Sequence, residues 1–363
     1  MPAMPVETTA AVLHDYNASF SLESLSLDGP GPGEVLVRVC ATGICHTDIK
    51  VGRGYAGVPM PVVLGHEGSG TVEAVGNGVT GLVPGDHVIL TFPSCGHCRP
   101  CREHHPAYCD QGQALSFSCS KQGYGNVHGH FFGQSSFAGF ALATAGNMVK
   151  VDRALPLENL GPLGCGFQTG AGIILNVLQP PPGRSLAVFG TGNVGLSAIM
   201  AARIAGLDPV IAVDTNPGRL DLARQLGASH VIRTGEGIDA GQAILEVCSR
   251  GVDFAVDTTN APAVVRQAFE SLANRGTCVH SGGGGKDLTF PGSGLLHGRT
   301  VTGVIQGDSV PQIFIPRLLA YHRDGQFPFD RLLTFYSLAQ INQAITDMEQ
   351  GIVVKPVLRI TGA

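Results

Sequence analysis

The chain has 363 residues, a formal net charge of −5 and 44% hydrophobic residues. This length predicts about two domains with sizeable cores, and the acidic balance argues against a nucleic-acid partner. The hydrophobic fraction excludes a disordered chain, and no apolar run reaches the roughly 20 residues that a membrane helix needs. The N-terminal segment MPAMPVETTAAVLHDY lacks the pattern of a signal peptide. The ten cysteines therefore predict a reducing, cytoplasmic location, with thiols on metals or in the core.

Residues up to about 150 read as short strands separated by turns. A buried strand is expected over 33–45, a strand with a tight turn over 70–79, and a turn followed by a strand over 84–90. Few helical periods occur in this part of the chain. The pattern predicts an all-β, partly barrel-like domain.

From about residue 160, expected strands and helices alternate, which predicts βαβ units and a parallel sheet. The segments that carry this prediction are a helix over 161–178, a strand, glycine-rich turn and helix over 181–207, a strand and helix over 209–228, a strand over 251–259, a helix over 264–274 and a strand over 276–284. Helices over 313–325 and 338–351 and a strand over 353–360 are expected to follow.

Four cysteines lie close together in the segment CGHCRPCREHHPAYC, namely Cys95, Cys98, Cys101 and Cys109. Two-residue gaps let consecutive thiolates turn inward on a tight loop, and the longer gap lets the chain close a tetrahedron. Four sulfurs with no open position describe a structural Zn²⁺ site. Disulfides between such close neighbours would form small strained rings, so the spacing favours zinc.

The motif GTGNVG, residues 190–195, follows the apolar strand SLAVF and precedes an expected helix. In this context Gly190 permits the turn, Gly192 lets a pyrophosphate approach the backbone, and Gly195 allows close helix packing. The helix N-terminus then offers N–H groups to the anion. The motif predicts a dinucleotide site, whereas glycine packing alone is the structural alternative.

Asp214 ends the next strand, IAVD, at about the separation expected for a ribose-binding acid. A carboxylate there accepts hydrogen bonds from ribose hydroxyls and repels the 2′-phosphate of NADP, so the sequence predicts NAD. Arg219 lies five residues further on, and an arginine there can receive a 2′-phosphate. How strictly the protein prefers NAD over NADP therefore stays open.

Three further residues suggest a metal site with an open position: Cys45 in GICHTD, His66 in LGHEG and Cys165 in GPLGCGFQTG. Two thiolates and an imidazole are a ligand set of catalytic zinc. The three residues are far apart in the sequence, so spacing alone cannot join them. A single Cys or His in such a region is also a common core residue.

The motifs GHEGSGTVEAVG, the cysteine run, GTGNVG and KPVLRI occur in the order seen in zinc-dependent medium-chain alcohol dehydrogenases, which the chain resembles over nearly its whole length. Within this family it is most similar to aryl-alcohol (benzyl-alcohol) dehydrogenases, through GPLGCGFQTGAG, FFGQSSFA and IQGDSVPQIFIPRL. The resemblance implies a Rossmann domain, with its doubly wound parallel α/β sheet, inserted in a GroES-like β catalytic domain. The implied domains are 1–166 with a zinc lobe at about 93–112, the Rossmann domain 167–305, and a C-terminal return over 306–363.

The same resemblance implies that Cys45, His66 and Cys165 bind a catalytic zinc, so that the chain holds two zinc ions. The implied reaction is reversible hydride transfer from an alcohol to NAD⁺, with an aldehyde as product. Asp48 would orient His66, as metal-bound histidines commonly require. Glu67 has two interpretations: a group that approaches the metal from behind, or a buried carboxylate paired with a basic side chain.

Thr47 matches the hydroxyl that relays the alcohol proton in the family. Lys50 stands where many members have a histidine as terminal base, and a lysine with a pKa of ~10.4 is a poor base at neutral pH. We therefore expect the ribose hydroxyls to pass the proton to water. Further residues match cofactor contacts, with His46 and Lys355 at the pyrophosphate and Thr169, Ser281 and Gly282 at the carboxamide. Three more residues match cofactor contacts in or after the glycine motif, namely Asn193, Val194 and Asn216.

The resemblance places Phe92, Phe131 and Phe132 along the substrate cleft, with Ile305 at its outer end and a small residue, Ala56, making room for a ring. Each phenylalanine has ordinary core packing as its alternative. The aromatic slot favours benzyl, cinnamyl or terpenoid allylic alcohols over ethanol.

Other functions remain as alternatives at this level: a geraniol- or perillyl-type terpenoid alcohol dehydrogenase, a glutathione-dependent formaldehyde dehydrogenase, and a zinc-stabilised NAD-binding or redox-sensing protein without enzymatic activity. A basic pocket for glutathione would need more than Arg53, which is the one basic side chain in GRGYAGVPM. We expect a homodimer or homotetramer, with the edge strand at 299–307 pairing with its copy.

Overall fold

The computed structural model describes residues 5–119, 124–235, 238–283 and 287–360. The chain divides into two units. The first comprises Met1–Cys165, Val310–Arg317 and Asp330–Ala363, and the second Gly166–Ser309 and Leu318–Phe329. The division falls inside helix α10 (Pro311–Arg323), so the second half of that helix belongs to the second unit. No helix within the described residues is long and apolar enough to cross a membrane.

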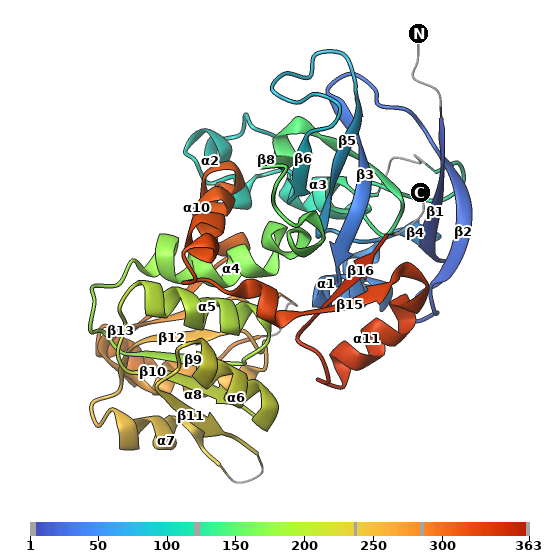
Figure 1. Cartoon of the computed structure of the whole chain (residues 1–363). Helices are drawn as coiled ribbons and strands as arrows, with labels where there is room; N and C mark the ends of the chain where they lie inside the picture. The colour runs from blue at the N-terminus through green and yellow to red at the C-terminus, as the bar shows by residue number, and fades with distance from the viewer. Residues whose placement is uncertain (1–4, 120–123, 236–237, 284–286, 361–363) are drawn as a thin grey trace. The chain divides into compact units, whose positions relative to one another are not determined.

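The first unit is built mainly of strands (Figure 1). Their bounds are β1 (Val6–Leu13), β2 (Ser21–Leu27), β3 (Glu34–Gly43), β4 (Val62–Val63), β5 (Gly68–Val75), β6 (His87–Leu90), β7 (Phe140–Thr144), β8 (Met148–Val151), β15 (Leu333–Ser337) and β16 (Lys355–Arg359). A three-stranded sheet has the order β2-β1-β4. A seven-stranded sheet has the order β15-β16-β3-β5-β6-β8, with β7 also paired to β3. Its pairs are antiparallel except β15 with β16.

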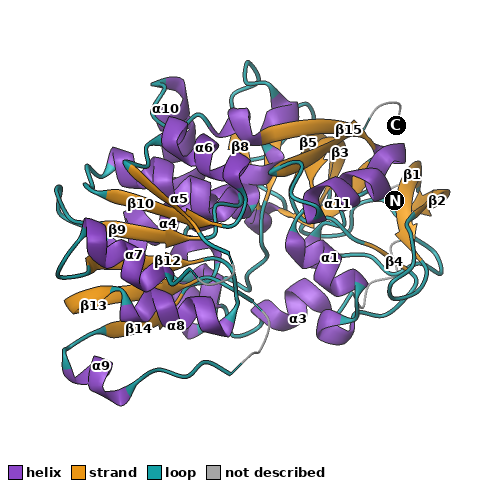
Figure 2. Cartoon of the chain, turned by 90° about the horizontal axis from the view of Figure 1, so that it is seen from below, coloured by secondary structure: helices purple, strands orange, loops and turns teal. Residues whose placement is uncertain are grey.

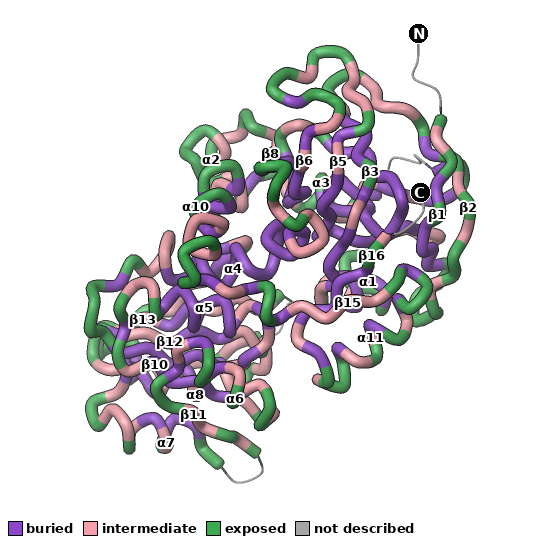
Figure 3. The backbone as a smooth tube through the Cα atoms, viewed as in Figure 1, coloured by how far each residue is buried: buried purple, intermediate pink, exposed green. Residues whose placement is uncertain are grey.

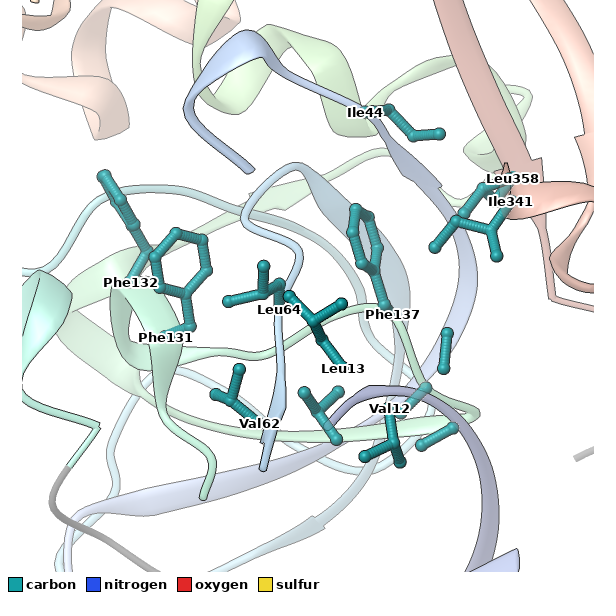
Figure 4. Packing of buried hydrophobic residues seen from close by; sticks show 14 of the residues in the cluster. Val12, Leu13, Ile44, Val62, Leu64, Phe131, Phe132, Phe137, Ile341 and Leu358 are labelled. Atoms are coloured by element: carbon teal, nitrogen blue, oxygen red, sulfur yellow. The ribbon is translucent and has the colours of Figure 1, made fainter. Parts of the chain in front are cut away.

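Strand β3 shows why this part of the sequence reads as a β domain. Val35, Val37 and Val39 are buried in one hydrophobic cluster, whereas Leu36 belongs to another. Side chains alternate across a strand, so β3 packs on both of its faces. The second cluster also contains Leu64 and other residues drawn in Figure 4. The predicted β domain in this part of the chain is thereby confirmed.

Short helices and turns connect these strands. The helices are α1 (His46–Gly52), α2 (Arg99–Arg102), α3 (Gly112–Phe117) and α11 (Ile341–Glu349). The 3₁₀ turns are η1 (Tyr55–Gly57), η2 (Pro106–Tyr108), η3 (Phe131–Gly133), η4 (Ala145–Asn147), η5 (Leu157–Asn159), η6 (Gly161–Gly164), η9 (Phe329–Leu332) and η10 (Leu338–Gln340).

The second unit is a six-stranded, all-parallel sheet with the order β11-β10-β9-β12-β13-β14. Its strands are β9 (Leu186–Phe189), β10 (Val210–Asp214), β11 (His230–Arg233), β12 (Val252–Asp257), β13 (Leu272–His280) and β14 (Thr300–Gly303). The central strand β9 is buried along its whole length, as parallel strands covered on both faces are (Figure 3).

Helices lie on both faces of this sheet (Figure 2). The helices and turns of the second unit are α4 (Gly166–Gly172), the π-helical continuation η7 (Ile173–Leu178), α5 (Asn193–Ile204), α6 (Pro217–Leu226), α7 (Ala240–Val247), α8 (Pro262–Glu270), α9 (Gly292–Leu296) and the turn η8 (Gln306–Asp308). The chain moves outward from β9 in one direction through β10 and β11, and then in the other through β12, β13 and β14. The strand order therefore reverses between β9 and β12, and the predicted Rossmann fold is confirmed.

One element differs from the sequence expectation. The helix expected over 264–274 ends at Glu270, and Leu272–Asn274 already belong to β13. Leu272 is buried in the sheet core and pairs with Val252, so packing outweighs the helical periodicity of this segment. The strand expected over 276–284 ends at His280, and residue 284 lies outside the described residues.

Candidate metal centres and dinucleotide site

Three separate segments of the first unit bring Cys45, His66 and Cys165 together. Cys45 is the N-cap of α1, His66 lies between β4 and β5, and Cys165 follows η6. One ligand atom from each, together with a carboxylate oxygen of Glu67, forms a group whose members all lie within 4.8 Å of one another. The fold thus gathers residues that sequence spacing could not connect.

Hydrogen bonds orient His66 within this group. The His66 Nδ1–H donates to Asp48 Oδ1 at 2.9 Å, and Asp48 also accepts the backbone N–H groups of Cys45 and Gly65. The other ring nitrogen, His66 Nε2, is buried and has no hydrogen-bond partner among the described residues. A buried imidazole nitrogen with a free lone pair, held by a carboxylate on its far side, fits a metal ligand.

The surroundings of the two thiols also favour metal binding. A hydrogen bond from Cys165, with His66 contributing, lowers the pKa of Cys45 well below its usual value despite burial. The same hydrogen bond and burial raise the pKa of Cys165. One thiolate is therefore favoured before a metal binds, and a bound cation deprotonates the second. Two sulfurs and one nitrogen are a donor set that suits Zn²⁺ with one position left open.

Glu67 and Lys355 form a buried ion pair behind these ligands. The Lys355 Nζ donates to Glu67 Oε2 at 2.7 Å, to Glu67 Oε1 at 2.9 Å and to the carbonyl oxygen of Ile44 at 3.0 Å. Neither side chain has exposed surface. Burial lowers the pKa of the Lys355 amine, but Glu67, Cys45 and Cys165 together raise it by more, so the pKa lies above its usual value.

This ion pair involves two residues with predicted roles. Lys355 was expected at the cofactor pyrophosphate, and in the structure its ammonium group is enclosed and makes three hydrogen bonds. Glu67 is a buried carboxylate paired with a basic side chain, as the second of its two interpretations describes. A side chain at Gly43 would place its Cβ 2.1 Å from Glu67 Oε2, so this glycine leaves room for the pair.

The remaining residues around α1 lie on its first turns. Thr47 is half-buried, and its hydroxyl oxygen lies 3.7 Å from Cys45 Sγ. His46 is exposed and Lys50 is half-buried. Thr47 is thus placed beside the ligand shell, as a relay hydroxyl would need to be.

Aromatic rings cover one side of His66. The Phe132 ring stacks on the imidazole, with centroids 4.5 Å apart and planes at 23°, and Phe131 meets it edge-on at 5.6 Å. Phe117 of α3 packs edge-on against both phenylalanines and was not singled out by the sequence. Figure 4 shows Phe131 and Phe132 side by side at one end of the cluster.

The predicted pocket residues differ in how far they are exposed. Phe131 has no exposed surface and packs against His66 from the core. Phe92 and Phe132 are each less than a tenth exposed. Ala56 is exposed at a position with a φ of 63°, and Ile305, in the second unit, is 56% exposed.

The cysteine quartet forms a second group in the first unit. The sulfurs of Cys95, Cys98, Cys101 and Cys109 all lie within 4.8 Å of one another. The ten cysteines, all within the described residues, are free, so the disulfide alternative is not realised. Hydrogen bonds from the backbone N–H groups of His97 and Cys98 lower the pKa of Cys95 to about 6. Four converging sulfurs, one of them favoured as thiolate, fit a closed zinc site.

The glycine motif of the second unit forms the turn that the sequence predicts. Gly190 follows β9 with a φ of 87°, and Gly192 is the N-cap of α5. A Cβ on Gly195 would lie 1.9 Å from the carbonyl oxygen of Gly190, so helix and strand approach too closely for any other residue. A Cβ on Gly192 would meet nothing within 4 Å. The backbone is therefore accessible to a ligand at the N-terminus of α5, whose first residues are Asn193 and Val194.

Asp214 is held in place by this turn. Its Oδ2 accepts from the backbone N–H and the hydroxyl of Thr191 at 2.6 and 2.7 Å, and its Oδ1 accepts from the backbone N–H of Asn216. The sequence did not single out Thr191. Asn216 was predicted to bind the cofactor, and in the structure its side chain caps α6 by accepting from the backbone N–H of Arg219. The Arg219 Nε is buried without a partner among the described residues.

The other predicted cofactor residues of the second unit lie at strand or helix ends. Ser281 and Gly282 directly follow β13, and Thr169 is a nearly buried residue of α4. The Ser281 N–H donates to the carbonyl oxygen of Asp257, so the backbone ladder continues one residue past β13.

Comparison with known proteins gives consistent matches along the chain. Residues 31–153 match the model of the alcohol dehydrogenase GroES-like domain, and residues 193–320 match that of zinc-binding dehydrogenases. A geraniol dehydrogenase from Castellaniella defragrans is 45% identical, and the match covers 97% of this chain and 98% of that protein.

Two solved structures are similar over nearly their whole length. An alcohol dehydrogenase zinc-binding domain protein from Burkholderia ambifaria has a TM-score of 0.96 and 49% identity, covering 99% of this chain and 100% of its own. The benzyl alcohol dehydrogenase from Acinetobacter calcoaceticus has a TM-score of 0.95 and 43% identity, covering 98% and 100%.

Proposed function

The chain belongs to the zinc-dependent medium-chain alcohol dehydrogenase family, and on that premise we propose that it oxidises primary aromatic or allylic alcohols to aldehydes with NAD⁺. One observation carries the proposal. Cys45, His66 and Cys165 converge from three segments, and the buried His66 Nε2 has no partner among the described residues. This ligand set with an open position is what a catalytic zinc requires.

When zinc is bound, it supplies a Lewis acid that lowers the pKa of the alcohol hydroxyl, and NAD⁺ accepts the hydride. Asp48 keeps the proton of His66 on Nδ1, so that Nε2 faces the metal. The Thr47 hydroxyl lies beside the ligand shell, where it would accept the proton of a bound alcohol and pass it on. Water is the final proton acceptor in this proposal.

The cysteine quartet holds a second zinc in this proposal. Four thiolates leave no position for a substrate, so this ion supports the lobe that contains α2 and η2. In this proposal the zinc held by Cys45, His66 and Cys165 is catalytic, and the zinc held by the quartet is structural.

The proposed cofactor is NAD rather than NADP. Thr191 and the backbone of Asn216 hold the Asp214 carboxylate at the end of β10, where the adenosine ribose of a dinucleotide lies in this fold. A carboxylate fixed in this way pairs with ribose hydroxyls and repels a 2′-phosphate. Arg219 could offset part of this repulsion, so we expect a preference and not an absolute requirement.

Two features support an aromatic or allylic substrate. The Phe132 ring stacks on the ligand His66, so a flat apolar surface adjoins the metal centre. The relatives named for benzyl alcohol and for geraniol are both more than 40% identical over nearly the whole chain. Both alcohols carry the hydroxyl on a carbon next to an sp² carbon. A terpenoid allylic alcohol such as geraniol is the second candidate, favoured by the geraniol dehydrogenase match.

We also propose that the protein forms a homo-oligomer. Strand β14 ends the six-stranded sheet, and Leu296 of the neighbouring α9 is 88% exposed. A sheet edge beside an exposed apolar side chain can pair with a second copy across a two-fold axis.

The direct test is NADH formation by the zinc-loaded protein with benzyl alcohol, geraniol and ethanol, each with NAD⁺ and NADP⁺. We expect kcat/KM for benzyl alcohol or geraniol to exceed that for ethanol by at least about tenfold, because each buried methylene is worth ~1–3 kcal/mol. A preference for ethanol would contradict the aromatic or allylic assignment. Activity with formaldehyde only when glutathione is present would favour the formaldehyde dehydrogenase alternative.

A further inference from the structure

Two loops at the carboxyl edge of the parallel sheet are tied together by side chains that the proposed chemistry does not use. We propose that His280 is a positioning residue which, by bonding to Asp257, holds the loop Ser281–Gly283 in the shape that receives the nicotinamide half of the dinucleotide. This inference rests on the proposed use of NAD and concerns the second unit alone.

The strand order locates the two halves of the cofactor. The glycine motif follows β9 and Asp214 ends β10, so the pyrophosphate and the adenosine ribose lie over one half of the sheet. The order reverses between β9 and β12, and a dinucleotide binds across such a switch point. The second nucleoside therefore lies over the ends of β12 and β13, where Asp257 and His280 are the last strand residues.

Asp257 organises the first of these loops from a fully buried position. Its Oδ1 accepts from the hydroxyl and the backbone N–H of Thr259 at 2.6 and 3.2 Å, and its Oδ2 accepts from the backbone N–H of Asn260 at 3.3 Å. The remaining strong bond comes from His280, whose Nδ1–H donates to Oδ2 at 2.9 Å. Since a carboxylate only accepts, this bond sets the tautomer of His280.

A second tie runs between the same two loops. Asn260 has a φ of 55°, and its side-chain Nδ2 donates to the carbonyl oxygen of Gly283 at 2.6 Å. Gly282 lies between the two ties: a Cβ there would be 2.5 Å from the Asn260 Cβ and 2.7 Å from the His280 Cε1. The imidazole and the asparagine thus enclose the Gly282 backbone and set the direction of its peptide groups.

The tied loops also connect to the glycine motif. The Thr258 hydroxyl lies 3.1 Å from the carbonyl oxygens of both Phe189 and Gly190, so the end of β12 is joined to the turn that receives the pyrophosphate. A carboxamide bound at Ser281–Gly282 would therefore meet backbone groups already oriented with respect to the pyrophosphate. Preorganised donors and acceptors raise affinity because they lose little freedom on binding.

The sheet itself does not need this imidazole. The backbone bond from Ser281 N–H to the Asp257 carbonyl oxygen and the pairing of β13 with β12 and β14 are made by main-chain atoms. Loss of His280 should leave the sheet intact, remove the shorter of the two hydrogen bonds to Oδ2 of a buried carboxylate, and loosen the loop. The affinity should therefore fall for ligands that contain the nicotinamide half, which touches this loop.

The experiment compares NADH with ADP-ribose, which lacks the nicotinamide ring, as ligands of the zinc-loaded protein. For His280→Ala we expect the Kd of NADH to rise by about tenfold or more, the range expected for a lost hydrogen bond to a buried charged group, while that of ADP-ribose changes less than about twofold. His280→Asn should restore NADH binding, because an asparagine Nδ2–H can replace Nδ1–H. His230→Ala, which alters a histidine at the start of β11, is the matched control and should leave both affinities unchanged.

Three results would overturn the inference. If His280→Ala weakened the binding of NADH and of ADP-ribose equally, His280 would have a general structural role. If the variant weakened the binding of neither ligand, His280 would have no role in cofactor binding. Failure of His280→Asn to restore binding, with its fold retained, would indicate a direct cofactor contact through Nε2. If the unaltered protein bound neither ligand, the proposed use of NAD would fail first, which separates the two claims.

Discussion

Replacing Lys355 by methionine tests the buried ion pair behind the catalytic ligands. The change removes all three hydrogen bonds of the ammonium group and leaves the Glu67 carboxylate enclosed without a partner. Breaking a buried pair on one side costs ~3–5 kcal/mol, since an uncompensated charge or an added proton remains inside. We expect the free energy of unfolding of the first unit to fall by this amount and its Tm by about 6–20 °C.

The assay is thermal and urea unfolding of the zinc-loaded protein, with zinc content measured on the same samples. Glu67→Gln combined with Lys355→Met should recover more than half of the loss, because no buried charge is left unpaired. Lys150→Met is the matched control: Lys150 pairs with Asp86 but is half exposed, so its removal should cost less than ~1 kcal/mol.

A different result would refute this reasoning. If Lys355→Met lowered stability by less than ~1 kcal/mol but raised the KM for NAD⁺ strongly, the lysine would serve the pyrophosphate after all. Equal losses in the single and double variants would also contradict the coupling between the two side chains.

Three other changes follow from the geometry. Asp48→Asn offers one acceptor oxygen to the three N–H groups that Asp48 now binds, so zinc affinity at the Cys45 site should fall ~10–100-fold, measured by metal loss to a chelator. Cys98→Ser should remove the second zinc and lower stability or assembly first, with kcat of the remaining folded protein nearly unchanged, measured by sedimentation and active-site titration. Asp86 has a pKa lowered to about 2, chiefly by its hydrogen bond to Lys150. Its contribution to stability should therefore be complete above pH ~4 and vanish as the pH falls toward ~2. Asp86→Asn should show no such loss in acid unfolding curves.

The local motifs of this chain could be read from the sequence because their chemistry depends on short spacings. The cysteine quartet needs only a tight loop, and the glycine motif needs only a strand before it and a helix after it. The same holds for Asp214, which ends the next strand of the same βαβ unit. Each is formed almost entirely by neighbours in the chain.

Contacts between distant segments could not be predicted from local sequence patterns. Glu67 and Lys355 are 288 residues apart, and nothing in either neighbourhood shows that the lysine would be enclosed. The proposed zinc ligands Cys45, His66 and Cys165 come from equally distant segments, and only the family resemblance connected them. The ring of Phe117 meets Phe132, and the hydroxyl of Thr191 meets Asp214, only in the folded chain. No rule based on sequence spacing could therefore have identified either residue.

Periodicity predicted the wrong secondary structure where tertiary packing determined the conformation. Leu272 follows an amphipathic segment and continues its helical period, yet it is drawn into the sheet core beside Val252. Phe131 illustrates the same limit for side chains, since an aromatic residue next to a metal ligand can line a cleft or support the ligand from the core. Its complete burial favours the second role.

The most direct test of the catalytic assignment is the rate of NADH formation from benzyl alcohol by Cys45→Ser, with fold and zinc content verified on the same sample. The substitution removes one thiolate of the open site and leaves the cysteine quartet intact. We predict that the variant keeps the quartet zinc and a folded structure but forms NADH at least ~1,000-fold more slowly, because the Lewis acid is lost. A folded variant that lacks the first zinc and still forms NADH at a rate close to that of the unaltered protein would contradict the assignment.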